Sequence, residues 1–342
     1  MLNIGLSYWG FCEPQCVVAN TPDGHRYGRP VLVDALTDRG HNVVALQDQR
    51  EDNPYKNLTY RSDLPDLDIV FLEWRWPTYK NSGLNKFEPD LDRQTEILDY
   101  YHELGVPVIA WDTDLKMTPD DERRWPNMII ADPTLEPENF IIARERLPFW
   151  SDFKPLMDAA PSPVEFGYIG NNYERDDMFM KYYSEPASLL RTEGIQTKVH
   201  GNWLQRSPER ASPETLIAKH PWVSFGPRVS FNDSMALLNS FICTVHITKP
   251  RYAKQGFASP RYLENIIMNT PALVPGEFLV PNLLGDYWTV NSPDDVYRKA
   301  LELKKMSAYA RETVVLEQKA SLLHHHDFSV AAVCNFIESK VG

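Results

Sequence analysis

The sequence predicts an α/β protein of two doubly wound, Rossmann-like domains that face each other across a cleft. At 342 residues the chain is longer than one hydrophobic core usually supports, so two domains are expected. Short apolar segments alternate with amphipathic ones in both halves, which is typical of parallel sheets covered by helices. Hydrophobic residues make up 43% of the chain and charged residues 24%, which indicates a folded protein.

The domain boundaries follow from the same pattern. Between residues 133 and 163 the alternation weakens into a proline-containing passage, which we interpret as the connection between the domains. We therefore expect a first domain over residues 1–160 and a second over residues 161–324. A last helix within residues 325–342 is expected to pack back on the first domain.

In the first half, Gly40 and Gly105 end the predicted helices, because glycine readily takes the left-handed conformation that follows a helix. Ligands of parallel sheets bind beside the carboxyl ends of the strands. The loops after Ser7, Glu73 and Trp111 are therefore expected to line a cleft. The predicted elements are strands 2–7, 42–46, 68–73 and 106–111 and helices 29–39 and 90–104.

The second half repeats this organisation. Ser259 is a favourable N-cap, Pro260 suits the first position of a helix, and the residues that follow are apolar enough to bury one face. The predicted strands are 164–169, 196–200, 223–225, 243–247 and 272–275. The predicted helices are 176–192, 232–239 and one from Pro260, with further helical segments from 293 to the end.

Composition excludes several classes of protein. No run approaches 18 apolar residues and the first ten residues lack a signal-peptide pattern, so we expect a cytoplasmic protein with no membrane partner. The cysteines are too few and scattered for a disulfide framework, and we expect reduced thiols without a metal site. The run His324 to His326 is expected to be solvated surface. The cysteines are Cys12, Cys16, Cys243 and Cys334.

The net charge of −12 is confined to the first half of the chain. Residues 1–160 contain 16 basic and 28 acidic residues, a balance of −12, whereas residues 161–342 contain 19 of each. Affinity for nucleic acid comes mainly from basic residues that displace counterions. The first half is therefore an unfavourable background for a polyanionic partner.

The stretch VIAWDTDLK places Asp112 and Asp114 after a buried strand. One ionised carboxylate there would suffice to deprotonate an attacking hydroxyl group. An Asp-X-Asp pair could instead hold a divalent metal, and two helix-capping aspartates are the plainer interpretation. We favour a base over a metal. The stretch EWRW, residues 73–76, could stack a sugar or a base, although surface packing explains it nearly as well.

Three segments of the second half suggest a nucleotide-diphosphate site. Gly170, Asn171 and Arg175 form a strand end, a glycine turn and a helix start, which could cradle a phosphate, or the arginine could simply be on the surface. Residues 226–229, which include Gly226, Arg228 and Val229, follow a strand, so their backbone could read a nucleobase, although a plain turn explains them equally well.

The third of these segments is the helix that starts at Pro260. Arg261 and Glu264 lie three apart on its first turn, where free N–H groups favour an anion. An arginine at this position suits a phosphate, and a carboxylate about 5 Å further along the axis suits a sugar diol.

These features resemble the phage DNA β-glucosyltransferases, which have the GT-B fold. Thr113-Asp114-Leu115-Lys116, followed by Trp125-Pro126, resembles the stretch around the family's catalytic aspartate, which makes Asp114 the expected base ahead of Asp112. The Gly170–Arg175 and 226–229 segments resemble the family's phosphate-binding and uracil-binding segments. The 260–266 segment resembles the one that holds phosphate and ribose. The resemblance thus assigns Arg261 to phosphate and Glu264 to the ribose hydroxyls.

The resemblance implies an inverting hexosyl- or pentosyltransferase that moves a sugar from a UDP-sugar, UDP-glucose first, to the hydroxymethyl group of a 5-hydroxymethylpyrimidine in DNA. 5-Hydroxymethylcytosine is the expected base, and the host cytoplasm is the expected location if a bacteriophage encodes the chain. A divalent metal is compatible with this reaction but not required. Gly256 stands where retaining GT-B enzymes carry a glutamate, which favours inversion.

Several features depart from the family or qualify the DNA acceptor. Only Arg175 matches a pair of arginines, with Arg228 or Lys249 as substitutes, and loop 20–30 is unlike the family's. Alternative functions are a GT-B transferase for a small-molecule, glycan or protein acceptor and a non-catalytic sugar-nucleotide binder. For DNA, two basic clusters and three tryptophans are available to bind phosphates and stack a flipped base. They are Arg26 with Arg29, Arg123 with Arg124, and Trp74, Trp76 and Trp111.

Overall fold

The computed structural model describes residues 1–8, 27–47, 58–74, 91–204 and 212–341, and the backbone of residues 79–81 and 87–89. The chain divides into two compact units. The amino-terminal unit comprises Met1–Asp152 and Phe328–Gly342, and the carboxy-terminal unit comprises Phe153–Asp327. The boundaries expected from the sequence, after residues 160 and 324, differ from these by a few residues.

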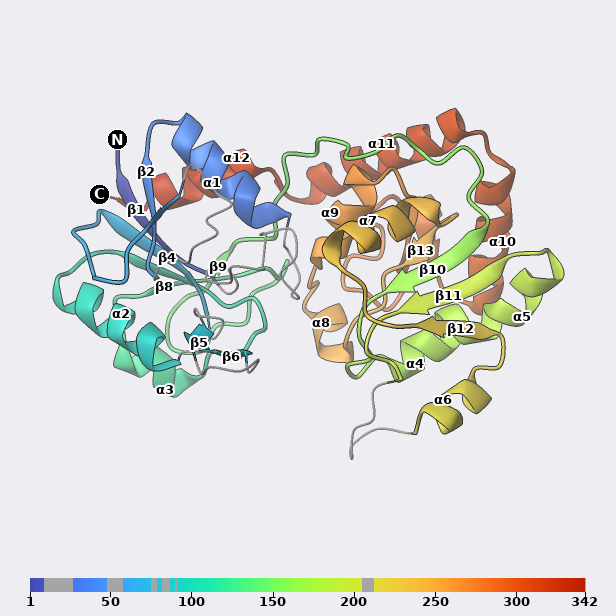
Figure 1. Ribbon diagram of the computed structural model, residues 1–342, viewed down its shortest axis with the longest axis horizontal. Helices are drawn as coiled ribbons and strands as arrows, with labels where there is room; N and C mark the ends of the chain where they lie inside the picture. Colours follow the sequence, from blue (N-terminus) through green and yellow to red (C-terminus); the bar gives the residue numbers. More distant parts are fainter. Residues whose placement is uncertain are drawn as a thin grey trace. The chain divides into compact units, whose positions relative to one another are not determined.

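The amino-terminal unit is built on a seven-stranded sheet in which all neighbouring strands are parallel. The strand order β3-β2-β1-β4-β7-β8-β9 places the first strand inside the sheet, so the chain winds outward in both directions (Figure 1). A short antiparallel hairpin, β5-β6, is separate from it. The strands are β1 (Asn3–Ser7), β2 (Asn42–Ala45), β3 (Thr59–Tyr60), β4 (Ile69–Glu73), β5 (Tyr79–Asn81), β6 (Phe87–Pro89), β7 (Val108–Trp111), β8 (Ile129–Asp132) and β9 (Glu145–Arg146).

Helices cover both faces of this sheet, which is why the central strands β4 and β7 are buried along their whole length. On one face, α2 buries Gln94, Ile97, Leu98 and Tyr101, the spacing of one helical face. On the other face α12 packs against α1, and Glu338 of α12 pairs with Arg39 and His41 at 2.9 and 2.8 Å (Figure 1). The helices are α1 (Gly28–Asp38), α2 (Leu91–Glu103), α3 (Pro119–Arg124) and α12 (Val330–Glu338).

The register of the sheet brings the ends of three strands together. Ser7 of β1 lies opposite Leu72 of β4, and Glu73 of β4 lies opposite Trp111 of β7. The segments that follow Glu73 and Trp111 therefore leave the sheet at one edge, as parallel pairing requires. Of the segment after Ser7, only Tyr8 belongs to the described residues before residue 27, so the prediction for that loop lies outside them.

The passage 133–163 is not the simple connection that the sequence suggested. It contains β9, the edge strand of the amino-terminal sheet, and the side chains of Leu147, Phe149 and Trp150 are buried. The indole Nε1 of Trp150 donates a hydrogen bond to Gly28 O at 2.7 Å. The sequence pattern missed this packing because the buried residues follow a two-residue strand and show no helical or strand period.

The carboxy-terminal unit contains two three-stranded parallel sheets that adjoin each other. A parallel bridge between Glu165 and Phe241 and a 2.7 Å hydrogen bond from Ile242 N to Glu165 O connect β10 with the segment that leads into β13. The combined order is β12-β11-β10-β13-β14-β15. The strands are β10 (Glu165–Ile169), β11 (Gln196–His200), β12 (Val223–Gly226), β13 (Thr244–Val245), β14 (Ala272–Pro275) and β15 (Thr289–Val290).

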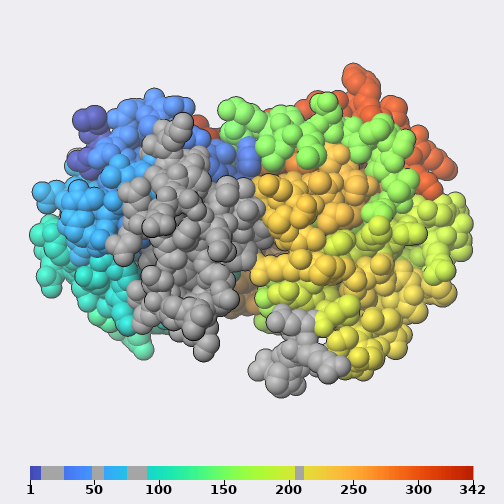
Figure 2. All heavy atoms as spheres, in the orientation of Figure 1, coloured from blue at the N-terminus to red at the C-terminus, as the bar shows by residue number. Residues whose placement is uncertain are grey.

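This order makes the carboxy-terminal unit doubly wound as well. The chain moves from β10 outward to β12, returns to β13 and moves outward in the other direction, so the winding reverses between β10 and β13. Such a reversal point is where open parallel sheets bind nucleotides. The yellow-to-orange segments that include α7 (Phe231–Ser240) lie at the surface of this unit (Figure 2).

The helices of this unit confirm the longer predictions and add short elements that the sequence pattern missed, such as α6 and α8. The predicted helix 176–192 is continuous but contains a π-helical segment in its middle. The helices are α4 (Asp176–Phe179), the π-helix η2 (Met180–Ser184), α5 (Glu185–Thr192), α6 (Pro213–Lys219), α7 (Phe231–Ser240), α8 (Pro250–Lys254), α9 (Pro260–Ile267), the 3-10 helix η3 (Asp286–Trp288), α10 (Pro293–Lys305) and α11 (Ala308–His325).

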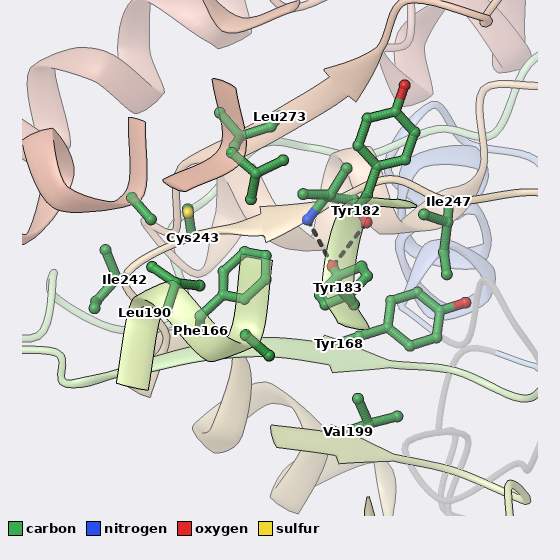
Figure 3. Packing of buried hydrophobic residues seen from close by; sticks show 14 of the residues in the cluster. Phe166, Tyr168, Tyr182, Tyr183, Leu190, Val199, Ile242, Cys243, Ile247 and Leu273 are labelled. Atoms are coloured by element: carbon green, nitrogen blue, oxygen red, sulfur yellow. Dashed lines mark hydrogen bonds between the residues drawn. The ribbon is translucent and has the colours of Figure 1, made fainter. Parts of the chain in front are cut away.

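The π-helical segment places two tyrosines in the core of the unit. Tyr183 lies between the rings of Phe166 and Phe179, with centroid distances of 4.8 and 5.5 Å. Its hydroxyl group donates to Val245 O at 2.8 Å and accepts from Val245 N at 2.6 Å, so both backbone polar groups of Val245 in β13 are satisfied (Figure 3). Tyr183 thus ties the helix after β10 to β13, across the reversal point.

In the part of the chain that the structure describes, no helix is long and apolar enough to cross a membrane. Of the four cysteines, Cys243 and Cys334 are buried free thiols, and burial raises the pKa of Cys334 to about 11. The predictions for Cys12 and Cys16 lie outside the described residues.

Candidate functional site

Asp112 and Asp114 follow β7 directly and belong to one tight turn. Thr113 N donates to Trp111 O at 3.1 Å, and Leu115 N donates to Asp112 O at 3.3 Å. Leu115 has a φ of 53°, the left-handed region, which costs a residue with a side chain about 1–2 kcal/mol. The contacts around the turn must therefore compensate for this local cost.

Asp112 is one of those contacts. Its side chain is 0% exposed; Oδ1 accepts from Lys116 N at 2.7 Å, and Oδ2 accepts from Met117 N at 2.9 Å and from Arg144 Nη1 at 3.1 Å. Burial raises the pKa of Asp112, while these three hydrogen bonds act in the opposite direction. Both oxygens are occupied within the fold, so Asp112 is suited to anchor the turn rather than to receive a proton from an acceptor.

Asp114, two residues later, is in a different environment. Its side chain is 34% exposed, and Oδ2 lies 3.1 Å from Lys116 Nζ. The two aspartates therefore do not offer a common metal site, because a shared cation would need oxygens of Asp112 that the fold already uses. Of the pair, Asp114 is the carboxylate that solvent, and hence a substrate, can reach.

Glu73 lies beside this turn at the same edge of the sheet. Its carboxylate pairs with Arg29 at 2.7 Å and accepts from Thr113 Oγ1 at 3.3 Å. The Arg29 side chain is 1% exposed, so it does not contribute to a basic surface. The prediction that Arg26 and Arg29 form a basic cluster for DNA phosphates is therefore wrong for Arg29. Arg26 itself lies outside the described residues.

The aromatic residues expected to stack a flipped base are also buried. Trp111 is 1% exposed and its indole Nε1 donates to Leu147 O at 2.9 Å, while Trp74 is 4% exposed and packs edge-on against Trp125. Neither offers an open ring face, so the expected stacking role is wrong for both. The sequence showed aromatic side chains at strand ends but not that the core would cover them. Trp76 lies outside the described residues.

The second basic cluster is at the surface, but acidic residues accompany it. Arg123 pairs with Asp120 at 2.5 Å and Arg124 pairs with Asp99 at 2.9 Å, with 64% and 53% of the two arginine side chains exposed. An exposed ion pair is easily exchanged for another partner, because it contributes little to stability. The cluster is therefore accessible without giving this surface a large positive charge.

In the carboxy-terminal unit, three glycines bring the ends of β10, β11 and β12 close together. A Cβ atom on Gly201 would lie 2.2 Å from Gly170 O, and Gly201 has a φ of 150°. A Cβ atom on Gly226 would lie 2.5 Å from the ring of His200. The ends of β10 and β11 thus pack backbone to backbone, and the end of β12 packs against the His200 ring, which leaves main-chain groups that a phosphate could approach.

Asn171 and Arg175 complete the turn after β10. Asn171 Oδ1 accepts from Asn202 N at 2.9 Å, which links the turns after β10 and β11. Arg175 occupies the N-cap position of α4 and donates to Asn171 O, and its buried Nε has no hydrogen-bond partner among the described residues. The guanidinium group is thus held at this turn with donor capacity to spare.

The neighbouring segments contribute further groups. Gly226 ends β12, Arg228 is exposed and Val229 is half-buried before Ser230 caps α7. Lys249 lies 3.0 Å from Glu174, the residue before Arg175. The pKa of Glu174 is lowered by its hydrogen bond to Lys249 and the charge of that lysine, with Arg251 and Arg175 adding to the effect. Three cationic side chains thus surround the turn after β10.

Helix α9 starts at Pro260 as predicted, but Ser259 makes no side-chain capping hydrogen bond. Arg261 and Glu264 share one helical face and pair with each other, with side-chain exposures of 28% and 5%. Each therefore already has a partner of opposite charge. A phosphate could bind to the other N–H groups of Arg261, since a guanidinium carries five donors.

Sequence reasoning missed His246 and Tyr262, which adjoin Arg261. His246 follows β13, and its ring stacks on Tyr262 with centroids 3.8 Å apart. His246 Nε2 and Tyr262 Oη are buried without a hydrogen-bond partner in the described part of the chain. Burial, and secondarily the charge of Arg261, lowers the pKa of His246 to about 3, so its ring is neutral near pH 7. In the sequence, the position of His246 at a strand end is the one local signal that could have indicated this buried pair.

Comparison with known proteins supports the fold over the whole chain. No family model and no curated protein matches the sequence. The structure resembles T4 phage β-glucosyltransferase with a TM-score of 0.60 at 12% identity, covering 99% of this chain and 98% of that one. It resembles an α-glucosyltransferase, solved with UDP and a 13-mer DNA containing an HMU base, with a TM-score of 0.62 at 12% identity and 99% coverage of both chains.

The likeness extends to glycosyltransferases with other names. Sucrose-phosphate synthase from Thermosynechococcus elongatus has a TM-score of 0.55 at 14% identity, covering 99% of this chain and 98% of that one. Further structures of the T4 enzyme contain UDP-glucose, or UDP and Mn²⁺. At these identities the comparisons show the fold, which is the GT-B fold of glycosyltransferases. They do not assign a reaction to this chain.

Proposed function

We propose that the protein is an inverting glycosyltransferase that moves a sugar from a UDP-sugar to the hydroxymethyl group of a 5-hydroxymethylpyrimidine in DNA. The observation that carries this proposal is the end-to-end likeness to two glucosyltransferases, one of them of phage T4 and the other solved with hydroxymethylated DNA. The short motifs around Asp114, Gly170 and Arg261 support it from the sequence.

The carboxy-terminal unit binds the donor in this proposal. Arg175, Arg261 and Lys249 would neutralise the diphosphate, with main-chain groups of the turn at Gly170 and Asn171 beside it. Glu264 would hold the ribose hydroxyls and the backbone of residues 226–229 the uracil. Support comes from the close packing of the three strand ends and from the unused donor capacity of Arg175.

The amino-terminal unit supplies the base. Asp114 accepts the proton of the acceptor hydroxyl group while the oxygen of that hydroxyl group forms a bond to the anomeric carbon of the sugar. The bond from that carbon to the phosphate oxygen breaks, and the electron pair leaves with UDP, whose charge the arginines stabilise. Attack opposite to the leaving group inverts the configuration. The exposure of Asp114, in contrast to Asp112, supports this assignment.

The proposed steps require no divalent metal. Asp112 and Asp114 do not fit a shared cation, although the T4 enzyme has been solved with UDP and Mn²⁺. Metal dependence is therefore a separate measurement, made by adding EDTA or Mn²⁺ to the transfer reaction. We expect the chain to transfer sugar in EDTA, since two arginines and a lysine suffice to neutralise the diphosphate.

A second candidate function keeps the donor site and changes the acceptor to a small molecule, a glycan or a protein. The acidic amino-terminal half favours it, as does the likeness to sucrose-phosphate synthase. A third possibility is a sugar-nucleotide binder without turnover. All three share the donor site, so the acceptor distinguishes them.

The test is incubation with labelled UDP-sugars and duplex DNA that contains 5-hydroxymethylcytosine or 5-hydroxymethyluracil. Unmodified DNA of the same sequence is the control. Transfer of label to modified DNA supports the proposal. Hydrolysis of the donor without transfer favours another acceptor, and tight binding of UDP with no turnover favours the binder.

A further inference from the structure

We propose that Arg144 is a positioning residue that fixes the turn carrying Asp114. This inference rests on the proposed role of Asp114 as the base. Arg144 lies far from the turn in sequence, just before β9, and no motif drew attention to it. Its side chain is only 3% exposed, so it cannot itself be a surface contact for DNA.

The guanidinium group of Arg144 holds both sides of the turn. Nη1 donates to Asp112 Oδ2 at 3.1 Å, at the start of the turn, and Nη2 donates to Met117 O at 3.3 Å, at its end. Asp112 in turn accepts the N–H groups of Lys116 and Met117. The guanidinium group of Arg144 therefore connects Asp112 with Met117, and residues 113–115 lie between these two anchored residues.

The other side of Arg144 is anchored as firmly. Nη2 also donates to Glu122 Oε1 at 3.1 Å, and Glu122 Oε2 accepts from Ile141 N and Ile142 N at 2.8 and 2.9 Å. Burial would raise the pKa of Glu122, but these backbone hydrogen bonds and Arg144 outweigh it and lower the pKa. Asp132 lies 3.9 Å from Nη1. Arg144 thus forms ion pairs with three buried carboxylates.

The geometry of the turn explains why such an anchor is needed. Leu115, directly after Asp114, takes the left-handed conformation, and the free peptide would avoid it. Asp114 itself has 34% of its side chain exposed and is paired with Lys116, whose side chain is 45% exposed, so the backbone of the turn largely sets the place of its carboxylate. A catalytic group displaced by about 1 Å can lose up to a hundredfold in rate.

The experiment is a double-mutant cycle of Arg144→Lys and Asp114→Asn, with Arg146→Lys on β9 as the matched control. Lysine keeps the charge but not the fork that reaches Asp112, Met117 and Glu122 together. We expect Arg144→Lys to lower kcat for sugar transfer about tenfold, with KM for the UDP-sugar within about twofold. In the Asp114→Asn background, the same substitution should change the residual rate by less than about twofold.

Hydrogen exchange gives a readout that does not require turnover. Arg144→Lys should speed exchange of the Lys116 and Met117 amides, which Asp112 holds, and leave those of α2 unchanged. If Arg144→Lys does not fold, Glu122→Gln is used in its place, because it removes the charge that holds Arg144 Nη2 without changing Asp112 or the turn, with the same expectations for kcat, for non-additivity with Asp114→Asn and for exchange.

The outcomes separate this inference from the proposed function. An unchanged kcat, an equal loss of rate in both backgrounds, or unaltered exchange at residues 116 and 117 would overturn the positioning role while leaving Asp114 as the base. If Asp114→Asn alone retains full kcat, the base is wrong and the positioning inference is overturned with it. A selective fall in kcat that disappears without Asp114 supports both.

Discussion

At the scale of single residues, two aspartates of the same turn differ because of their surroundings. Asp112 uses both carboxylate oxygens to hold Lys116, Met117 and Arg144, whereas Asp114 keeps a solvent-exposed carboxylate. The sequence places both at a strand end and cannot distinguish them by spacing. The distinction comes from Arg144, which lies 32 residues from Asp112 and reaches it only in the fold.

The phosphate role of Arg261 gives a prediction about affinity. Arg261→Ala should weaken UDP binding by about 1.5–3 kcal/mol, because a charge-assisted hydrogen bond to the diphosphate is lost. Isothermal titration calorimetry would measure this as roughly a tenfold to 150-fold rise in Kd. Arg298→Ala is the control, since Arg298 forms an i,i+3 pair with Asp295 as Arg261 does with Glu264. UDP affinity that is equal in the two variants would refute the assignment.

The buried ring of His246 gives a prediction about pH. Its pKa is about 3 in the folded chain, against about 6.5 when unfolded, so below pH 6.5 the unfolded state binds more protons. The folded state should therefore lose up to about 1.4 kcal/mol per pH unit as pH falls from 6.5 towards 3. His246→Phe keeps a stacking ring but cannot titrate.

The measurement is the midpoint of thermal unfolding at pH 7 and pH 5. The acid-induced decrease should be smaller for His246→Phe than for the wild type. The surface variant His324→Ala should behave like the wild type. If His246→Phe and the wild type lose the same number of degrees, His246 is not neutral and buried as described.

At the scale of elements, the parts that the sequence predicts well are those with strong local signals. The helices before Gly40 and Gly105 show a helical period and defined ends, the strands β4 and β7 are continuous apolar runs, and all are confirmed. Short elements such as α3 and β9 carry too few residues to show a period. Local signals likewise could not predict that Ser259 leaves its capping hydrogen bond unmade or that Trp111 is covered by the core.

In the candidate donor site, too, some features have local sequence signals and others depend on packing. The strand-end glycines and the first turn of α9 are visible in the sequence because glycine and an Arg-Glu pair at such positions have specific uses. The stacking of His246 on Tyr262 depends on how β13 and α9 pack. No spacing between residues 246 and 262 predicts that contact, so the sequence could not supply it.

The glycine contact between β10 and β11 gives a prediction at this scale. Gly201→Ala would place a Cβ atom 2.2 Å from Gly170 O, so the turn after β10 must move. We expect loss of stability by more than about 1 kcal/mol and weaker binding of UDP, measured by urea unfolding and calorimetry. Gly194→Ala is the control, because Gly194 also has a positive φ, 73°, but has no atom within 4 Å of the added Cβ. Equal effects of both changes on UDP affinity would contradict the role of this contact.

At the scale of the whole molecule, the chain separates its chemistry between two units. The candidate base belongs to the amino-terminal unit and the candidate donor groups belong to the carboxy-terminal unit. The charge is separated as well, since the excess of acidic residues lies within residues 1–160. Under the proposed function, DNA would be bound through a few local contacts, such as those of Arg123 and Arg124 among the described residues.

This charge distribution predicts that non-specific binding of DNA by the proposed enzyme is weak. Unmodified duplex DNA should bind only at low salt, and the slope of log K against log salt should correspond to only about two or three phosphate contacts. Fluorescence anisotropy over a series of salt concentrations would measure it. A slope that indicates ten or more contacts would mean that a basic surface exists outside the described residues.

The most direct test of the account compares sugar transfer and UDP binding in one variant. Asp114→Asn changes the amino-terminal unit only, and Asp120→Asn, an exposed aspartate of the same unit, is its control. We predict that Asp114→Asn lowers the turnover of UDP-glucose onto 5-hydroxymethylcytosine DNA at least about a hundredfold, with UDP affinity unchanged. Undiminished turnover in this variant, or the absence of transfer by the wild-type chain, would contradict the account.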